Sequence, residues 1–285
     1  TNIDMLATSS ITLGNSLNFA QTSGQSVTFT ATNGNISFSD SSDTIETSGG
    51  SIVMSAGGTL SVGAMKTNGG DITLAGTDFN LSGALNAGVG TLTILGGSGE
   101  TIGLDGTTAS TTASTVSTIC NGTACGLTLV QSELSDISAA KLVIGDSSSG
   151  NMYIDGVTLS HISGGVTLNS SGSSGSVEFG TGGATIKLAT INAGNGITIN
   201  GDVSVTQSAI FNADYDANGT GKLIIASGDA ITSTDNQSIS ITANDIDIYS
   251  LGTISSGTGS TTIAVSDGGT IGLGGTSGNM TITGA

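Results

Sequence analysis

A short alternating phrase recurs along the whole chain: an apolar residue, a small polar residue that is most often Thr, a second apolar residue, and then Gly, Asn, Ser or Asp. Because side chains alternate between the two faces of a strand, each phrase points two apolar groups one way and one hydroxyl the other way. A single strand of this kind cannot bury its apolar face, but many stacked strands can. Typical phrases are Val27-Thr28-Phe29, Ile72-Thr73-Leu74, Leu92-Thr93-Ile94, Val166-Thr167-Leu168, Ile197-Thr198-Ile199 and Met280-Thr281-Ile282.

The phrases return at regular distances. Those that begin at Val27, Ile52, Ile72 and Leu92 follow one another at similar intervals, and Ile263 follows Ile239 at an interval of the same size. A coil of roughly 20–25 residues with two or three short strands accounts for this spacing. We therefore expect residues 1–285 to form one all-β parallel solenoid of about a dozen coils, about 55–65 Å long at ~4.8 Å per layer. An antiparallel sandwich is the competing interpretation.

Composition favours stacked parallel strands. The chain has 285 residues, of which 47 are Gly and none is Pro. Pro lacks the N–H that an interior strand donates to its neighbour, so its absence suits a continuous ladder. Gly supplies the backbone conformations that tight corners require. Regular apolar pairs and a positive mean hydropathy of +0.25 argue against a disordered chain.

Two stretches interrupt the rhythm and predict insertions that leave the rod, at residues 106–126 and 208–221. The first ends in Cys120-Asn-Gly-Thr-Ala-Cys125, where the turn-forming Asn-Gly brings the two cysteines together. We expect a Cys120–Cys125 disulfide in an oxidising compartment, with free thiols as the alternative. A zinc site lacks partners because His161 is the only His of the chain, and we assign His161 no catalytic role.

The second insertion contains a candidate calcium site. Asp214-x-Asp216-x-Asn218-Gly219 matches the first half of an EF-hand-type loop, in which alternate oxygen ligands converge on one cation. The acidic residue that should follow six positions after the Gly is missing, because residue 225 is Ile. Calcium held by Asp214, Asp216 and Asn218, in a calcium-stabilised repeat protein, is therefore one hypothesis. A solvated turn rich in Asp and Asn is the other.

A pair of carboxylates raises the question of catalysis. Asp245 and Asp247 alternate with Ile246 and Ile248, so both carboxylates should project from one exposed strand face. Paired carboxylates can act as acid and base on sugars. Asp245 and Asp247, with Asp214 and Asp216, are the candidates if the chain is a carbohydrate-active β-helix enzyme. The chain has no Arg to hold an acidic substrate and its four lysines are scattered, so we expect no enzyme activity.

Charge excludes two classes of partner. The formal net charge is −17, from 21 acidic residues against four lysines. Such a chain repels nucleic acid and anionic membrane surfaces. No apolar run approaches the ~20 residues of a transmembrane helix, so we expect no membrane insertion. Divalent cations are natural counter-ions, and the alternative is that the acidity keeps a sheet protein soluble.

The central Thr of each phrase predicts outward hydroxyl columns if the coils stack in register. Flat threonine ladders are typical of solenoid ice-binding proteins, but paired T-x-T segments are scarce here, at Thr28–Thr30, Thr91–Thr93 and Thr281–Thr283. Cross-strand packing of threonine side chains is the structural alternative.

Several strings resemble the repeats of filamentous-haemagglutinin-type exoproteins, which are large secreted bacterial adhesins. They are ELSDISAAKLVIGDSSSGNMYIDGVTL from Glu133 to Leu159, GTLTILGG, ITANDIDIYSLGTISSGTGSTTIAV and the repeated G-x-I-T-L phrases. The resemblance implies a right-handed parallel β-helix, an extracellular or cell-surface location and a structural, adhesive role. We expect a rod segment of a longer polypeptide, whose partners are neighbouring repeats, other copies stacked end to end in a filament, or a host or surface glycan.

Overall fold

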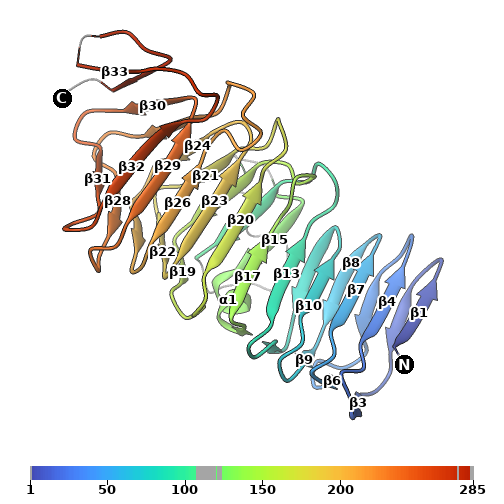
Figure 1. Cartoon of the computed structure of the whole chain (residues 1–285). Helices are drawn as coiled ribbons and strands as arrows, with labels where there is room; N and C mark the ends of the chain where they lie inside the picture. Colours follow the sequence, from blue (N-terminus) through green and yellow to red (C-terminus); the bar gives the residue numbers. More distant parts are fainter. Residues whose placement is uncertain (1, 107–119, 121–123, 275, 283–285) are drawn as a thin grey trace.

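The chain winds into a β-solenoid in the computed structural model, which describes residues 2–106, 120, 124–274 and 276–282 (Figure 1). It is all-β, with about 10 turns of about 24 residues each, so the predicted fold class is confirmed. The number of turns is lower than the expected dozen because two coils are long. One of them lies between Leu92 and its partner Leu142, and the other lies between Ala209 and its partner Ile239.

One parallel sheet of 11 strands runs the whole length of the rod, and we call it the long sheet. Ile52 pairs with Ile72, and Ile72 with Leu92, as their spacing in the sequence predicts. The predicted pairing of Ile239 with Ile263 is wrong by two residues, because Ile263 pairs with Ile241. The strands of the long sheet are β1 (Ile3–Ala7), β4 (Val27–Ala31), β7 (Ile52–Ala56), β10 (Ile72–Ala75), β13 (Thr91–Leu95), β17 (Lys141–Ile144), β20 (Val166–Ser170), β23 (Ala189–Ala193), β26 (Ala209–Asn212), β29 (Ile239–Ala243) and β32 (Thr261–Val265).

The other two sides of the N-terminal half belong to separate sheets. The four-stranded sheet contains β2 (Ile11–Leu13), β5 (Ile36–Phe38), β8 (Thr59–Val62) and β11 (Asp78–Leu81). The N-terminal five-stranded sheet contains β3 (Leu17–Ser23), β6 (Thr44–Ser48), β9 (Ala64–Lys66), β12 (Leu85–Asn86) and β16 (Ile137–Ser138).

The C-terminal half has its own pair of sheets. In spatial order, the seven-stranded sheet contains β15 (Leu127–Val130), β14 (Ile102–Asp105), β18 (Met152–Asp155), β21 (Val177–Phe179), β24 (Ile197–Ile199), β27 (Lys222–Ile225) and β30 (Asp245–Ile248). The C-terminal five-stranded sheet contains β19 (Val157–Leu159), β22 (Ala184–Ile186), β25 (Val203–Val205), β28 (Ala230–Ser233) and β31 (Thr253–Ser255). Two final strands, β33 (Ile271–Leu273) and β34 (Met280–Ile282), pair with each other.

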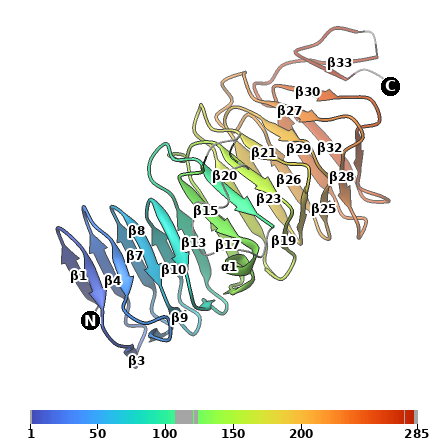
Figure 2. The same ribbon diagram turned by 180° about the vertical axis from the view of Figure 1, so that it is seen from behind.

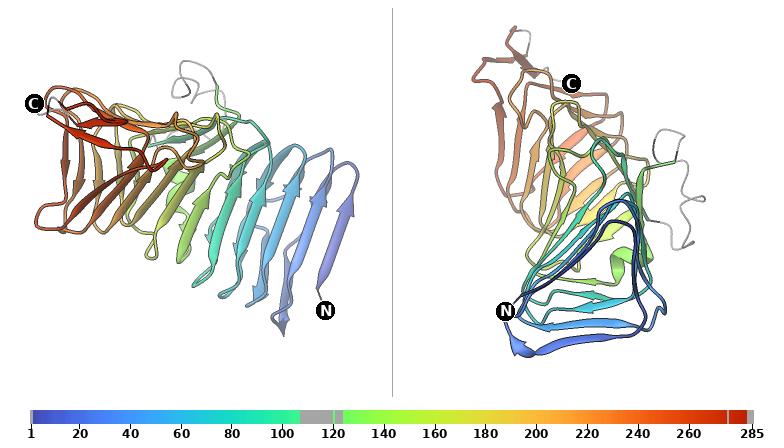
Figure 3. Two further views of the ribbon diagram at one scale, coloured as in Figure 1. Left: turned by 45° about the horizontal axis from the view of Figure 1, so that its top comes forward. Right: turned by 90° about the vertical axis from the view of Figure 1, so that its right-hand side faces the viewer.

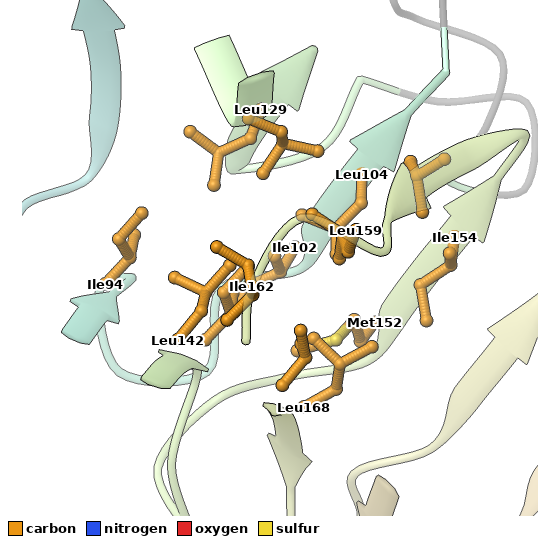
Figure 4. Close-up of a cluster of buried hydrophobic side chains, with 14 of the residues drawn as sticks. Ile94, Ile102, Leu104, Leu129, Leu142, Met152, Ile154, Leu159, Ile162 and Leu168 are labelled. Carbon is orange, nitrogen blue, oxygen red and sulfur yellow. The ribbon is translucent and has the colours of Figure 1, made fainter. Parts of the chain in front are cut away.

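The core fills the inside of the coils, whose outline is roughly triangular at the N-terminal end (Figure 3). Inward residues of successive strands stack into aliphatic columns, into which Phe29, Phe179 and Phe211 are fully buried. Figure 4 shows the middle of the rod, where Leu168 of the long sheet, Ile154 of the seven-stranded sheet and Leu159 of the C-terminal five-stranded sheet lie inside the coils. Burying one aliphatic side chain stabilises the fold by roughly 1.5–3 kcal/mol, so these columns supply its main driving force.

The long coil between β13 and β17 reorganises the middle of the rod (Figure 2). After β13 the chain runs to β14 and then returns as β15, which pairs with β14 on its N-terminal side. A short helix, α1 (Gln131–Ser135), then leads into β16. Strand β11 ends the four-stranded sheet and β15 begins the seven-stranded sheet. We call this junction between β11 and β15 the seam.

The two predicted insertions lie in the two long coils. Of residues 106–126, positions 107–119 and 121–123 lie outside the described residues. The second insertion begins later than predicted. Strand β26 occupies Ala209–Asn212 within the long sheet, so the excursion covers residues 213–221. The phrase Ala-Ile-Phe-Asn is a weak strand signal because its first inward residue is only an alanine.

Glycine is required where successive corners stack without space between them. Gly50, Gly70 and Gly90 occupy the same corner of three coils, and a Cβ on Gly70 would lie 2.4 Å from the carbonyl oxygen of Gly50. The buried hydroxyl of Thr67 donates a hydrogen bond of 2.5 Å to the carbonyl oxygen of Gly70. Thr47 makes the same 2.5 Å bond to Gly50 one coil earlier.

We predict that Gly70→Ala opens this corner and lowers the free energy of unfolding by about 1–3 kcal/mol, as overpacking of a tight site does. The control is Gly14→Ala, because no atom lies within 4 Å of a Cβ built there. Its effect should stay within about 0.5 kcal/mol. Thermal unfolding followed by circular dichroism measures both variants, and equal melting temperatures would contradict the steric argument.

Candidate functional site

The proposed calcium ligands close their own loop. Asp214 is 1% exposed, and its carboxylate accepts hydrogen bonds from the backbone N–H groups of Asn218 (3.2 Å) and Gly219 (3.1 Å). Ser266, two coils further along the rod, donates its hydroxyl to the same carboxylate. The side chain of Asn218 donates to Asp216 at 2.8 Å and accepts from the backbone N–H of Thr220 at 3.0 Å. These contacts form a turn closed by Asp and Asn side chains.

A cation at this loop would compete with the hydrogen bonds that hold it. Both oxygens of Asp214 are already directed at N–H or O–H donors. Within the described residues, no group of three or more His, Cys, Asp or Glu side chains is arranged to hold a metal ion. The geometry therefore favours a structural role for Asp214, Asp216 and Asn218.

Asp245 and Asp247 share one lysine across two coils. Lys222 on β27 places its ammonium 3.0 Å from Asp245 and 3.3 Å from Asp247 on β30. Burial alone would raise the pKa of Asp245, but hydrogen bonds from Lys222 and from backbone N–H groups and the lysine charge bring it below its ordinary value. Hydrogen bonding to Asp245 raises the pKa of Lys222 against the opposing effect of burial. Lys222 thereby links both aspartates of β30 to the neighbouring coil.

Of the two isoleucines that alternate with these aspartates, only Ile246 is buried in the core. Ile246 is 4% exposed, whereas Ile248 is 41% exposed. Strand β30 is the outermost strand of its sheet, so no further strand of that sheet covers Ile248. A second lysine, Lys66, makes a similar link between coils, with its ammonium 3.0 Å from Glu46. Two of the four lysines are thus partners of acids one coil away.

The remaining residues singled out in the sequence lie apart from these groups. Cys120 and Cys125 form a disulfide with their Cα atoms 5.4 Å apart, within the usual range. His161 is exposed in a turn that follows β19. The threonines at the centres of the phrases on the long sheet do point outward, and Thr73 pairs with Thr93. Val53, Val143 and Ile210 interrupt that column, so it is not a continuous hydroxyl ladder.

Sequence reasoning missed two carboxylates at the seam. Glu133 on α1 accepts hydrogen bonds of 3.0 Å from the backbone N–H groups of Leu81 on β11 and Val130 on β15. Asp78 accepts from the N–H of Phe79 at 2.8 Å and from the backbone of Thr128. The side chains thus take the place of ladder partners where two edge strands do not pair. The sequence signal was a Glu three residues after Val130, the residue that precedes the one-turn helix, as at the N3 position of a capping box.

Burial raises the pKa of both seam carboxyl groups, Glu133 and Asp78. It is the largest effect on Glu133 and raises its pKa, and the neighbouring charge of Asp78 raises it further, although the two N–H donors oppose the shift. Burial likewise raises the pKa of Asp78. The folded protein therefore holds these protons more tightly than the unfolded chain does.

The N-terminal end of the rod presents unpaired strand edges. Strands β1, β2 and β3 are the outermost strands of their three sheets, and within the described residues no strand pairs with their outer edges. The core is also uncovered at this end. Its partly buried members are Ile3, Met5, Ile11, Leu17 and Phe19.

The C-terminal end is covered on one side. Strand β34 lies beside β30, where the backbone N–H of Thr281 donates a 3.1 Å hydrogen bond to Asp245. Met280 of β34 is fully buried against the core. Figure 1 shows β33 beyond β30 at this end. Strands β30, β31 and β32 also have no ladder partner on their outer edges within the described residues, so the two ends differ in that β34 packs beside β30 at the C-terminal end.

The sequence matches no protein-family model, no curated protein and no solved structure in the comparisons with known proteins. Within the described residues, no helix has the length and apolar character needed to cross a bilayer. Any function must therefore be argued from the solenoid and its surfaces.

We predict that removing calcium leaves the fold unchanged. Because the oxygens of Asp214 and Asn218 already accept bonds from the loop itself, the melting temperature should be the same in chelator and in excess calcium. Differential scanning calorimetry under both conditions measures this. A ligand that binds only the folded state raises the melting temperature. A melting temperature that rises with calcium would therefore contradict this prediction and support the calcium-site hypothesis.

We predict a pH dependence that originates at the seam. A carboxyl whose pKa is raised on folding contributes stability that is complete below its unfolded value, about 4.3 for Glu, and is lost as pH rises through the folded value. The melting temperature of the wild type should therefore fall relative to that of Glu133→Gln between about pH 4 and pH 7. Thermal unfolding across this range measures the difference. If the melting temperatures of the wild type and Glu133→Gln changed in parallel across this pH range, Glu133 would have the same pKa in the folded and unfolded states, which would contradict the prediction.

Proposed function

We propose that the chain is a structural, adhesive rod segment of a secreted surface filament or adhesin. The observation that supports this most directly is the N-terminal end, where the edges of three sheets and the end of the core are uncovered. Unpaired edges of this kind are templates for further strands. A following or preceding coil of the same polypeptide, or the end of another copy, would cover them.

The rest of the molecule suits a spacer. The parallel ladders tie every coil to the next, and Lys66–Glu46 and Lys222–Asp245 add links of 3.0 Å between neighbouring coils. In a solenoid each coil contacts only its neighbours, so length can grow without a change of fold. The resemblance to filamentous-haemagglutinin-type repeats supports the same role, with an extracellular or cell-surface location and a host or surface glycan as the partner.

The contacts of the acidic residues give less support to catalysis. Asp245 and Asp247 share Lys222, and Asp214 is buried in its own loop. A carbohydrate-active enzyme needs two carboxyl groups that are free to face a sugar. We therefore do not adopt that alternative.

We predict that the purified chain forms end-to-end strings of rods, each about 50 Å long for 11 layers at ~4.8 Å. Ile11→Lys should abolish the strings, because Ile11 belongs to the uncovered core and a lysine there places a charge in the joint. The matched control is Thr12→Lys, whose side chain is exposed on the outside of the same strand. Negative-stain electron microscopy measures the distribution of lengths.

Single rods of the wild type at every concentration would refute stacking through this end. Strings that persist in Ile11→Lys would place the joint elsewhere. Location is tested separately: antibodies raised against the chain should label the surface of intact source cells, and labelling confined to permeabilised cells would contradict a surface filament.

A further inference from the structure

The outer surface of the long sheet differs in charge from the rest of the molecule. On each strand the residues between the inward positions form two outward columns in register from coil to coil. From β4 to β32 these columns contain no charged residue. The first column is Thr28, Val53, Thr73, Thr93, Val143, Thr167, Thr190, Ile210, Ser240 and Thr262, and the second is Thr30, Ser55, Ala75, Leu95, Asn169, Asn192, Asn212, Thr242 and Ala264. We call this surface the neutral face.

Outward positions of a strand are where charged residues normally lie, and two other sheets of the rod follow that rule. The seven-stranded sheet carries Glu178, Asp245 and Asp247, and the N-terminal five-stranded sheet carries Glu46 and Lys66. The C-terminal five-stranded sheet also has neutral outward residues, but they form one short column of hydroxyls. The neutral face is thus the longest uncharged surface that the described residues form.

The neutral face also carries aliphatic side chains at outward positions. Val53, Leu95 and Val143 are partly exposed on β7, β13 and β17, and Ile210 on β26 is 46% exposed. Asn192 donates a 2.7 Å hydrogen bond to Asn169 on the neighbouring strand, so these amides lie along the sheet instead of projecting from it. Aliphatic side chains at outward positions can interdigitate with those of a second sheet that packs face to face.

The area of the face matches a stable interface. The ten strands from β4 to β32 at ~4.8 Å and five residues at ~3.3 Å give a surface of about 48 Å by 16 Å, or roughly 770 Å², in which Lys141 at the start of β17 is the one charged residue of the strands. An interface of standard size buries about 800 Å² on each partner. Contact over the whole face would therefore suffice for a specific complex.

We propose that the neutral face is a lateral docking surface for a second copy of this chain, which packs sheet against sheet about two-fold symmetry. Each copy has a net charge of −17, so two copies repel wherever their acidic surfaces meet. Across the neutral face they meet without opposed charges. The same patch then serves both partners, as an isologous dimer requires.

Charge repulsion makes the proposal testable through salt. Raising the ionic strength from about 0.01 M to about 1 M shortens the Debye length from about 30 Å to about 3 Å and screens the repulsion between the acidic rods. Dimerisation should therefore strengthen with salt, whereas an interface held by ion pairs would weaken. Sedimentation equilibrium of the wild-type chain at both salt concentrations measures the dissociation constant.

The discriminating variants are two Thr→Glu substitutions on two strands of one coil. Thr167 lies on the neutral face beside the central strand β17, and Thr185 lies at a half-exposed outward position of β22 on another sheet. Thr167→Glu should weaken the dimer at least about a hundredfold, because like charges placed in an interface cost several kcal/mol. Thr185→Glu should leave the dissociation constant unchanged. Circular dichroism establishes that both variants keep the fold.

A wild-type chain that remains monomeric at about 100 μM in high salt would overturn the proposal, since an interface of this size should associate in the micromolar range or below. So would a dimer that Thr167→Glu leaves intact. Binding of ice or a polysaccharide at the neutral face of a monomer would assign it a different occupant. End-to-end stacking is distinguished by Ile11→Lys, which breaks strings and leaves a lateral dimer intact.

Discussion

The backbone ladder between successive coils is the constraint on which the whole structure depends. Every interior strand exchanges backbone hydrogen bonds with the coils on both sides: Val27 donates its N–H to Ser51 of the following coil, and Thr32 donates to Ala7 of the preceding one. A residue without an N–H would therefore leave a gap in the ladder. The chain contains no Pro. The ladder also fixes the register, and register stacks the inward side chains into columns. Each column buries residues that a single coil would leave exposed, and for that reason no coil is stable by itself.

The sequence predicted what depends on a regular repeat. Ile52, Ile72 and Leu92 recur at a coil length, and they pair as that spacing implies. The prediction failed where a coil departs from the repeat. Ile263 pairs with Ile241 because a shift of two residues preserves which side chains face inward, so the apolar pattern cannot distinguish the two registers. Helix α1 has only five residues and is too short to show a helical period.

The roles of the candidate site residues were harder to predict because their partners lie a coil or more away. Asp214 meets Ser266, and Glu133 meets the backbone of Leu81, and each pair is 52 residues apart in the chain. A local motif such as Asp-x-Asp-x-Asn-Gly shows which oxygens are available. It does not show which donors the stacking of the coils will bring to them. Contacts of this kind can be predicted only once the length of every intervening coil is known.

The acidity of the chain and the neutrality of the long sheet have one physical origin. Aspartates close the corners: Asp40, Asp146 and Asp267 each accept a hydrogen bond from a backbone N–H two residues later, as short polar side chains do in turns. More than half of the acidic residues lie between strands, and Asp4 is the one acidic residue within a strand of the long sheet. Asp at a corner brings a negative charge that Asn would not. The corners therefore carry the charge that keeps rods apart, while the flat strands between them remain free to pack. The proposed lateral docking falls on the long sheet for this reason, because Asp4 and Lys141 are the charged residues within its strands.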